Sequence, residues 1–524
     1  MSTSLSTVPV PRRRGLIARP QTLAALAGVA AAALGIGSSE VMAGLLPGAT
    51  SLVDAIGQSI IDRQPPGAKD LVVQLFGTND KLALEILVLV VALAVGAVLG
   101  TLAWRSIRPA IVGFGAFGIL GFVAGLGQPL ASPSMIAVQA ALGTGLAIQT
   151  LGWLLGRLRG RGDRDDPAIS DPARRSFLLR TGAVGVAAIA AGAYGRMALA
   201  GNRTAPAPST PLPRPGETVP PLAAGADLAP TTEGLTPIVV PNDQFYRIDT
   251  ALLVPSLDTA TWRVRIHGLV DREVTLTWDQ LIAMPQFEQY VTIACVSNEV
   301  GGHLVGNAKW TGVRLRDVLD LAGPTAQATQ LVGRSVDGWT SGTPMDWIMD
   351  PDREPMIALQ MNDQPLPRQH GYPARLIIPG LYGYVSATKW LAEIELTTWE
   401  GYDAYWVPLG WSKKGPILTQ SRIDTPRGSA APGRVAIAGV AWAPDRGISK
   451  VEVAVDGTWH EAQLSTPIST ATWVQWVLPW DATPGQHELQ VRATDGTGTL
   501  QEELRSRPAP DGARGFHTVS VSVS

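Results

Sequence analysis

The sequence is poor in the residues that bind redox centres: it holds one cysteine and six histidines in 524 residues. A single cysteine cannot form a disulfide within the chain, so the fold is not a disulfide scaffold. All six histidines lie at or beyond His267, so helices formed before that residue cannot supply a histidine pair to a haem. The same residues lack the cysteines that an iron–sulfur cluster needs. No haem-attachment motif occurs later in the chain either.

Charge is also scarce. Charged residues make up 16% of the chain, against about a quarter in ordinary soluble proteins. The formal net charge of -2, from 42 basic and 44 acidic residues, argues against a nucleic-acid-binding protein. A chain of 524 residues is too long for one hydrophobic core, so two or more domains are expected.

The scarcity of charge is confined to the first 200 residues, where the apolar runs lie. Five runs reach the length of about 20 residues that a membrane-spanning helix needs, and one of them, LALEILVLVVALAVGAVLGTLAW, has no polar face. The predicted spans are 21–45, 82–104, 110–126, 133–155 and 177–200. We therefore predict a transmembrane region over 21–200, preceded by a cytoplasmic N-terminus over 1–20.

The arginines predict the orientation. PRRRGLIAR precedes the first span, WRSIRP joins the second and third, and GRLRGRGDRDD precedes the fifth. Since basic loops stay in the cytoplasm, residues after 200 are predicted to lie outside the cell membrane. Arg174-Arg175, followed by Phe177-Leu178 and an Ala/Gly-rich run, resembles a twin-arginine export signal; an ordinary basic-flanked helix is the alternative.

Few polar side chains interrupt the spans. Glu40 and Glu85 fall near the outer ends of their spans, where anchoring at the membrane interface is their expected role; a functional intramembrane carboxylate is the alternative. Gln139 and Gln149 in the fourth span are expected to form helix–helix hydrogen bonds.

The rest of the chain reads as a linker and two domains. Residues 201–237 are rich in proline and predict a semi-rigid spacer. Residues 238–425 mix strand runs such as TWRVRIHGLV and YVTIACV with short helical patterns such as TWDQLIAM, which predicts an α+β domain. Residues 426–524 alternate with period two between Gly/Asp/Pro turns, and predict an immunoglobulin-like all-β sandwich.

The only cysteine, Cys295, ends a β-branched run in YVTIACVSNEVGG. It is either an inert buried residue, a reactive thiol or a metal ligand. A Cys–His protease pair with His303 or His370 lacks a local signature. A zinc site lacks ligand pairs at helical spacing, and a peroxidatic thiol lacks a resolving cysteine. A soft metal held by one thiolate is a further possibility, beside the inert buried residue.

The residues around Cys295 resemble the sulfite oxidase family of molybdopterin-dependent oxidoreductases. The motifs come in the family's order: NDQFYRID, the Cys295 stretch, GNAKWTGVRLRDVL, SVDGWTSGTPMDWIM and ALQMNDQPLPRQHGYPARLIIPGLYGYVSATKWL. The resemblance covers about 236–524, since the last 100 residues are similar to the family's dimerisation-type domain. It implies a molybdenum–pyranopterin cofactor, with Cys295 as metal ligand and catalytic residue, and a homodimer as one form of assembly.

The resemblance also implies a set of cofactor-binding residues at the matching motif positions. They are Asn242, Phe245, Tyr246, Arg247, Ser335, Asp337, His370, Arg375, Tyr384, Ser386 and Lys389. Of these, Arg375 and Lys389 also make sense independently, because a buried phosphate needs charge-assisted donors.

The implied reaction is a two-electron oxygen-atom transfer at an extracytoplasmic molybdenum centre, of the sulfoxide or N-oxide reductase type. The Asn-Arg-Arg run that follows the cysteine in animal sulfite oxidases is here Val296-Ser297-Asn298-Glu299, and Trp339 stands near the place of a substrate tyrosine. Sulfite dehydrogenase is the alternative if Arg247 or Lys309 reaches the metal. A non-catalytic tethered binding module is an alternative of another class. The partners expected are a small oxo-donor or oxo-acceptor, the lipid bilayer, and a separate electron carrier, either a quinone, a cytochrome or a membrane redox protein.

Overall fold

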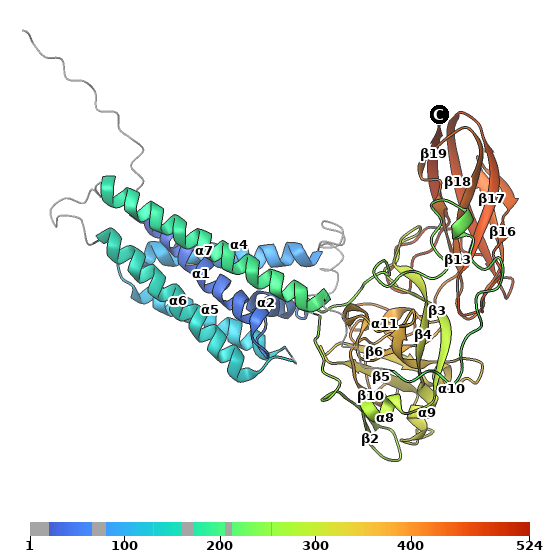
Figure 1. Ribbon diagram of the computed structural model, residues 1–524, viewed down its shortest axis with the longest axis horizontal. Helices are drawn as coiled ribbons and strands as arrows, with labels where there is room; N and C mark the ends of the chain where they lie inside the picture. Colours follow the sequence, from blue (N-terminus) through green and yellow to red (C-terminus); the bar gives the residue numbers. More distant parts are fainter. Residues whose placement is uncertain (1–19, 65–79, 129, 160–170, 205–211, 253) are drawn as a thin grey trace, which may run out of the picture. The chain divides into compact units, whose positions relative to one another are not determined.

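The computed structural model describes residues 20–64, 80–128, 130–159, 171–204, 212–252 and 254–524. The chain forms two compact units: an N-terminal helical unit that ends at Asn202, and a second unit, rich in strands, that begins at Arg203 (Figure 1). The predicted cytoplasmic segment 1–20 lies outside the described residues, except for Pro20.

Five helices of the first unit are long and apolar enough to cross a membrane, which confirms the five predicted helices. A shorter helix follows the first of them and has only ten residues, too few for the pattern of a span. The helices are α1 (Pro20–Leu45), α2 (Leu52–Ile61), α4 (Asp80–Ala103), α5 (Arg108–Leu126), α6 (Pro133–Arg159) and α7 (Asp171–Thr204).

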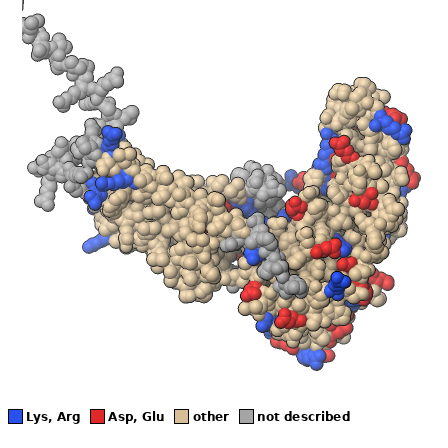
Figure 2. Space-filling view, viewed as in Figure 1, with Lys and Arg blue, Asp and Glu red and all other residues tan. Residues whose placement is uncertain are grey.

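The surface of the helical unit fits a lipid environment. Its visible face is almost free of charge over most of its length, and basic side chains gather at one end (Figure 2). Glycines let the helices approach closely: a Cβ on Gly28 of α1 would lie 2.0 Å from the carbonyl oxygen of Gly96 in α4. Such small-residue contacts are typical of packed membrane helices.

The two acidic side chains near the span ends do not act as simple interfacial anchors. Glu40 is 3% exposed, and its Oε2 lies 3.0 Å from Nε of Arg196 in α7. Nη1 of Arg196 also pairs with Asp54 at 2.8 Å and with Glu85 at 3.2 Å. The expectation for Glu40 and Glu85 was wrong because their common partner, Arg196, is more than 100 residues away in the sequence.

The two glutamines of α6 differ from one another. The Gln139 amide donates to the carbonyl oxygens of Ser39 in α1, at 2.9 Å, and of Thr50, at 2.7 Å. This is the expected contact between segments of the bundle. Gln149, in contrast, lies on an exposed face of α6.

The second unit contains two sheets before residue 400. The first has the order β2-β1-β10-β5-β6, and the second has the order β3-β4-β7-β8, with β9 also paired to β7. The first sheet consists of β1 (Arg263–Gly268), β2 (Val274–Thr277), β5 (Gln330–Ser335), β6 (Thr340–Pro344) and β10 (Leu391–Thr397). The second consists of β3 (Gln286–Ala294), β4 (Val305–Arg314), β7 (Met356–Met361), β8 (Gln364–Pro365) and β9 (Arg375–Ile377). Short helices connect them: α8 (Trp278–Ile282), α9 (Leu315–Asp320), α10 (Met345–Met349) and α11 (Gly383–Ser386).

Local sequence explains these elements. In β1 the burial alternates between exposed and buried, as its period-two pattern predicts. Thr277 and Gln280 form a capping box at the start of α8. The α+β prediction for this part of the chain is thereby confirmed.

The C-terminal residues form two packed sheets, as the alternating pattern predicted. One has the order β11-β13-β17-β16 and the other β12-β19-β18-β14-β15. Strand β11 (Gln420–Thr425) lies before the predicted domain boundary at residue 426. It nevertheless pairs with β13 (Gly433–Trp442) and so belongs to the C-terminal sheets. The other strands are β12 (Gly428–Ala430), β14 (Ile448–Val455), β15 (Thr458–Glu461), β16 (Gln463–Leu464), β17 (Val474–Ala482), β18 (Gly485–Asp495) and β19 (His517–Val523).

Part of the segment predicted as a spacer is anchored. Residues 205–211 lie outside the described residues, but 212–237 run along the second unit and bond to it. Glu217 forms an ion pair with Arg314 of β4 at 2.6 Å, and Gln475 of β17 bonds Asp227 and the carbonyl of Thr236. Proline content predicts stiffness but does not reveal such contacts, which depend on distant residues.

The sandwich also touches the loop that follows β3. Arg422 of β11 donates to the carbonyl oxygen of Gly302 at 2.9 Å and pairs with Asp424 at 2.6 Å, while only 2% of it is exposed. At Gly301, with φ +78°, a Cβ would lie 2.3 Å from the ring of His517. The loop after Cys295 is thus held by side chains of the C-terminal sheets.

Candidate active site

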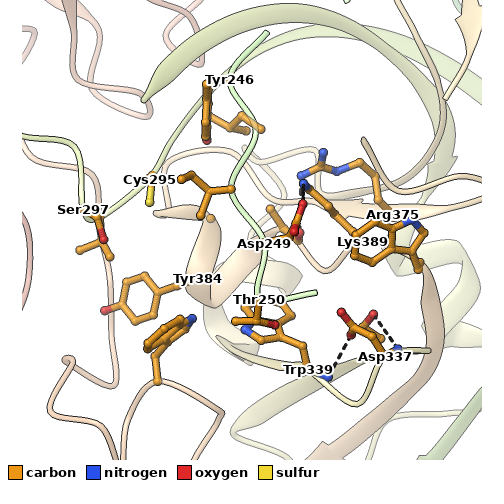
Figure 3. Close-up of a pocket in the computed structure, with 18 of the residues that line it drawn as sticks. Tyr246, Asp249, Thr250, Cys295, Ser297, Asp337, Trp339, Arg375, Tyr384 and Lys389 are labelled. Carbon is orange, nitrogen blue, oxygen red and sulfur yellow. Dashed lines mark hydrogen bonds and ion pairs between the residues drawn. The ribbon is translucent and has the colours of Figure 1, made fainter. Parts of the chain in front are cut away.

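One cavity of the second unit collects most of the predicted site residues (Figure 3). Eight of them line it: Phe245, Tyr246, Cys295, Ser335, Asp337, Arg375, Tyr384 and Lys389. Cys295 and Ser297 lie at one end, and Arg375 and Lys389 at the other, beyond Tyr246 and Asp249 (Figure 3). Residues from four of the five motifs therefore meet around one space.

Cys295 is placed by the edge of the β3–β4 pair. Ala294, the last residue of β3, pairs with Val305, and the Cys295 amide donates to the carbonyl oxygen of Leu304 at 2.9 Å. The Cys295 carbonyl oxygen then accepts from the Asn298 amide at 3.0 Å, which closes a turn. The residue is 8% exposed, so its thiol faces the cavity from a well-fixed backbone.

Arg375 is a buried cation without an acidic partner among the described residues. It is 2% exposed, and its Nη1 donates to the carbonyl oxygen of His370 at 3.0 Å. Its Nε has no hydrogen-bond partner within the same described residues. Burial lowers the pKa of the guanidinium to about 10. A buried cation with an unsatisfied donor is suited to bind an anion.

Lys389 lies in the same region. Its Nζ is 3.3 Å from Oδ2 of Asp249, which also accepts from Nε of Arg247 at 2.8 Å. Burial lowers the pKa of Lys389 to about 8. Arg247 and Lys389 thus share the carboxylate of Asp249, and the charge of Arg375 also lowers the pKa of Lys389. This excess of positive charge favours an anionic group.

Tyr246 lies between the thiol and the cations. Its ring stacks on Phe245 at 5.2 Å between centroids, and Phe245 in turn packs edge-on against Trp310. The Tyr246 pKa is raised well above its usual range, because of burial first and of the nearby Cys295 charge second. Its hydroxyl therefore keeps its proton and can only donate or accept a hydrogen bond.

Tyr384 lies on the side of the cavity near Cys295 (Figure 3), and further aromatic rings pack beside it. Tyr384 and Trp411 have centroids 6.1 Å apart, and Trp411 and Trp406 have centroids 6.4 Å apart. The Tyr384 hydroxyl donates to the carbonyl oxygen of Ser412 at 2.7 Å, which fixes its ring. Trp339 lines the cavity as well.

Asp337 and Ser335 form a polar turn at the cavity wall. Oδ1 of Asp337 accepts from the Trp339 amide at 3.1 Å, and the Ser335 hydroxyl accepts from the Asp337 amide at 3.4 Å. Burial raises the pKa of Asp337. This turn orients Trp339 into the cavity.

Four predicted residues do not line the cavity. Asn242 and His370 stand behind it, joined by a bond from His370 Nε2 to the Asn242 carbonyl oxygen at 3.0 Å. Burial lowers the His370 pKa to about 3, so the ring is neutral. Arg247 pairs with Asp249, and the Ser386 hydroxyl donates to the carbonyl oxygens of Leu381 and Tyr382 in its own turn. These side chains position their neighbours.

Sequence reasoning missed several lining residues. Asp249 is the last residue of the NDQFYRID motif and Thr250 follows it directly, so the motif itself was the signal for them. Trp406 and Trp411, in AYWVPLGW, carried no signal besides an unusual density of tryptophan. They come to the cavity through a loop after β10, which pattern analysis does not place.

Comparison with known proteins identifies the class of this site. Residues 251–406 match the family model described as the oxidoreductase molybdopterin binding domain. Mouse mitochondrial sulfite oxidase is 30% identical over 323 residues, which are 52% of this chain and 58% of that protein. The chain thus spans a little over half of that relative. An uncharacterised oxidoreductase of Bacillus subtilis is 32% identical over 158 residues, which are 30% of this chain and 76% of that protein.

Among solved structures, the sulfane dehydrogenase of Paracoccus pantotrophus aligns with a TM-score of 0.48 and 23% identity, over 55% of this chain and 83% of that one. The family model and the bacterial relative define the class. The chain belongs to the molybdopterin-binding oxidoreductases of the sulfite oxidase family.

The described residues fit the molybdenum cofactor that this family implies. The Cys295 thiolate suits a soft, redox-active metal, and metal binding deprotonates it. Arg375, with its unpartnered Nε, and Lys389 would hold a phosphate group. Among the described residues no cluster of three His, Cys, Asp or Glu side chains is arranged to hold a metal.

Proposed function

We propose that the protein is a membrane-anchored molybdopterin-dependent oxidoreductase that removes an oxygen atom from a neutral sulfoxide or N-oxide. When bound, the cofactor supplies the two-electron oxygen-atom transfer, and the protein binds and orients the reactants. Cys295 is proposed as the protein ligand of the metal and the catalytic residue.

The observation that carries this proposal is the separation of charge within the cavity. Cations lie at the end away from Cys295, where they would hold the cofactor, while Tyr384 lies near the thiol (Figure 3). The ring of Trp411 packs against Tyr384, and the ring of Trp406 packs against Trp411. A dianion such as sulfite requires cations beside the metal, whereas rings favour a neutral or soft substrate.

The two cations that would favour sulfite are engaged elsewhere. Arg247 pairs with Asp249 at 2.8 Å. Lys309 pairs with Asp363 at 2.5 Å and with Glu288 at 3.4 Å, and it does not line the cavity. These contacts weigh against the sulfite dehydrogenase alternative, although the mouse relative is named a sulfite oxidase. Glu299, the acidic residue of the turn after Cys295, does not line the cavity either.

The remaining side chains have defined tasks in this proposal. Tyr246, whose hydroxyl keeps its proton, would donate a hydrogen bond to the thiolate or to the cofactor. Arg375 and Lys389 would bind the phosphate, and His370 holds Arg375 through its carbonyl oxygen. The aromatic rings exclude water from the position of the substrate.

We also propose the membrane topology. Arginines gather at one end of the helical unit (Figure 2), where the bounds of the helices place Arg105, Arg108, Arg157 and Arg174. Such a basic end faces the cytoplasm, so the catalytic unit would lie outside, after export through the twin-arginine signal at Arg174-Arg175. Pairing of two chains through the C-terminal sheets remains a prediction.

The test uses the full chain, purified from a host that makes the cofactor. Reduced viologen should be oxidised by the wild-type protein with dimethyl sulfoxide, methionine sulfoxide or trimethylamine N-oxide, and Cys295→Ala should abolish this. Sulfite-dependent reduction of ferricyanide that exceeds the reductase activity would refute the neutral-substrate proposal. A folded chain that contains no molybdenum would favour the tethered binding module.

A further inference from the structure

The helical unit contains a cavity of its own, between α1, α2, α4, α5 and α6. Its volume is 110 Å³, the same order as the engineered apolar cavity of about 150 Å³ that binds benzene. The wall is almost entirely apolar, with Leu52, Val88, Leu89, Phe114 and Phe117 among its residues. Val88, Leu89 and Phe117 are only half-buried. The space therefore suits one six-membered ring.

One side chain in this wall has an unmet hydrogen-bonding need. Gln139 is 0% exposed, and its Nε2 lies 2.9 Å from the Ser39 carbonyl oxygen, 3.0 Å from Ser39 Oγ and 2.7 Å from the Thr50 carbonyl oxygen. Its Oε1 accepts no hydrogen bond within the described residues. Leaving a buried carbonyl oxygen without a hydrogen bond is destabilising, so a ligand that donates a hydroxyl proton would be stabilised there.

Ionisable side chains lie directly beside the two residues, Ser39 and Thr50, that accept hydrogen bonds from Gln139. Ser39 precedes Glu40, and Thr50 precedes Ser51, whose hydroxyl donates to Glu40 Oε1 at 2.8 Å. Glu40 Oε2 then pairs with Arg196, which also binds Asp54 and Glu85. The hydrogen-bonded segments that hold Gln139 thus continue into a cluster of three carboxylates, which can take up protons released in the cavity.

We propose that this cavity binds the ring of a lipid-soluble quinol, with one hydroxyl of the quinol donating to Oε1 of Gln139. The inference rests on the proposed reductase function, which needs an electron donor. No histidine precedes His267 and the only cysteine is Cys295, so the helical unit cannot carry a haem or an iron–sulfur cluster. The overall reaction balances as quinol plus sulfoxide giving quinone, sulfide and water, with two electrons and two protons transferred.

The chemistry of Gln139 distinguishes the quinol from other occupants. A lipid acyl chain would fill the apolar space and leave Oε1 unpaired. The oxidised quinone would place a carbonyl oxygen against Oε1, which repels it. The reduced form is therefore the form that the cavity should bind most tightly.

Binding is measured on the full chain in phosphatidylcholine nanodiscs, from the quenching of fluorescence of the ring analogue 2-heptyl-4-hydroxyquinoline N-oxide. Decylubiquinol, decylubiquinone and decanol are the competitors. Gln139→Leu removes the acceptor, and Gln149→Leu makes the same change on an exposed face of α6. Ala92→Phe fills the cavity, and Ala94→Phe places the same ring on the exposed side of α4.

We expect saturable binding that decylubiquinol displaces at least tenfold better than decylubiquinone or decanol. Gln139→Leu should weaken decylubiquinol about tenfold, equivalent to about 1.4 kcal/mol, and Ala92→Phe should abolish binding. Both control variants should bind like the wild type. Equal displacement by decanol, or equal affinity in Gln139→Leu, would overturn the proposal.

Viologen-driven sulfoxide reduction by the same wild-type preparation separates the two proposals. A preparation that is active with viologen and binds no quinol overturns the cavity proposal alone. A preparation that binds quinol but reduces no sulfoxide refutes the proposed reductase function and leaves the binding site standing.

Discussion

Replacing Arg375 with methionine should have opposite effects on the apoprotein and on cofactor binding. The depression of the Arg375 pKa from 12.5 to about 10 corresponds to roughly 3 kcal/mol lost by burying the charge. Methionine has a similar length and avoids this cost. The substitution also removes the hydrogen bonds from Arg375 to the His370 and Ala387 carbonyl oxygens. Each of these hydrogen bonds contributes about 1 kcal/mol. The apoprotein should therefore be as stable as the wild type, or more stable by about 1 kcal/mol.

Cofactor binding should weaken in the same variant. A charge-assisted hydrogen bond contributes about 1.5–3 kcal/mol, so Arg375→Met should lower the affinity for the cofactor by roughly 10- to 150-fold. The assay combines thermal unfolding of the full chain from a cofactor-deficient host with the molybdenum and pterin content of the chain from a cofactor-producing host.

Arg422→Met is the matched control. Arg422 is also 2% exposed, but it pairs with Asp424 at 2.6 Å and does not line the cavity. Breaking a buried ion pair leaves an uncompensated charge and costs about 3–5 kcal/mol. The reasoning is refuted if Arg375→Met destabilises the apoprotein as much as Arg422→Met does, or if Arg375→Met retains its full content of pterin.

Three further predictions concern the same unit. The pKa of Lys389 in the folded protein, about 8, lies below its value of 10.5 in the unfolded chain, so above pH 8 the unfolded chain binds more protons than the folded one. The stability of the apoprotein should therefore rise between about pH 8 and 10.5. Lys389→Met should abolish this rise when the melting temperature is measured as a function of pH. Trp411→Ala should raise KM for a sulfoxide several-fold in steady-state assays, since an aromatic contact contributes about 0.5–1.5 kcal/mol, whereas Trp399→Ala, outside the cavity, should leave KM unchanged. Gly301→Ala should destabilise the chain by about 1–3 kcal/mol and more than Gly457→Ala, because both have positive φ but only Gly301 faces a side chain, that of His517; equal losses would contradict this.

The sequence predicts most clearly what depends on local pattern. The apolar runs predict the five long helices because their length and composition alone decide them. Alternation predicts the C-terminal sheets, although β11 begins before the expected boundary since strand pairing, not pattern, assigns it to its sheet. The motifs, which occur in the same order as in the family, predict that Cys295, Arg375 and Lys389 line one cavity.

What sequence reasoning could not supply is pairing across long distances. Arg196 and Glu40 are apart in sequence, so a charge that reads as an interfacial anchor is in fact ion-paired. Ser386 shows the converse error: the family motif predicts a cofactor-binding residue, but its hydroxyl donates to carbonyl oxygens of its own turn. The tryptophans Trp406 and Trp411 reach the cavity through an irregular loop whose course depends on tertiary packing.

The central claim is that Cys295 ligates molybdenum. X-ray absorption at the molybdenum edge of the full chain counts the sulfur ligands in the wild type and in Cys295→Ser. The claim predicts one sulfur ligand fewer in the variant, with pterin still present because Arg375 and Lys389 remain. An unchanged number of sulfur ligands, with a molybdenum content equal to that of the wild type, would contradict it.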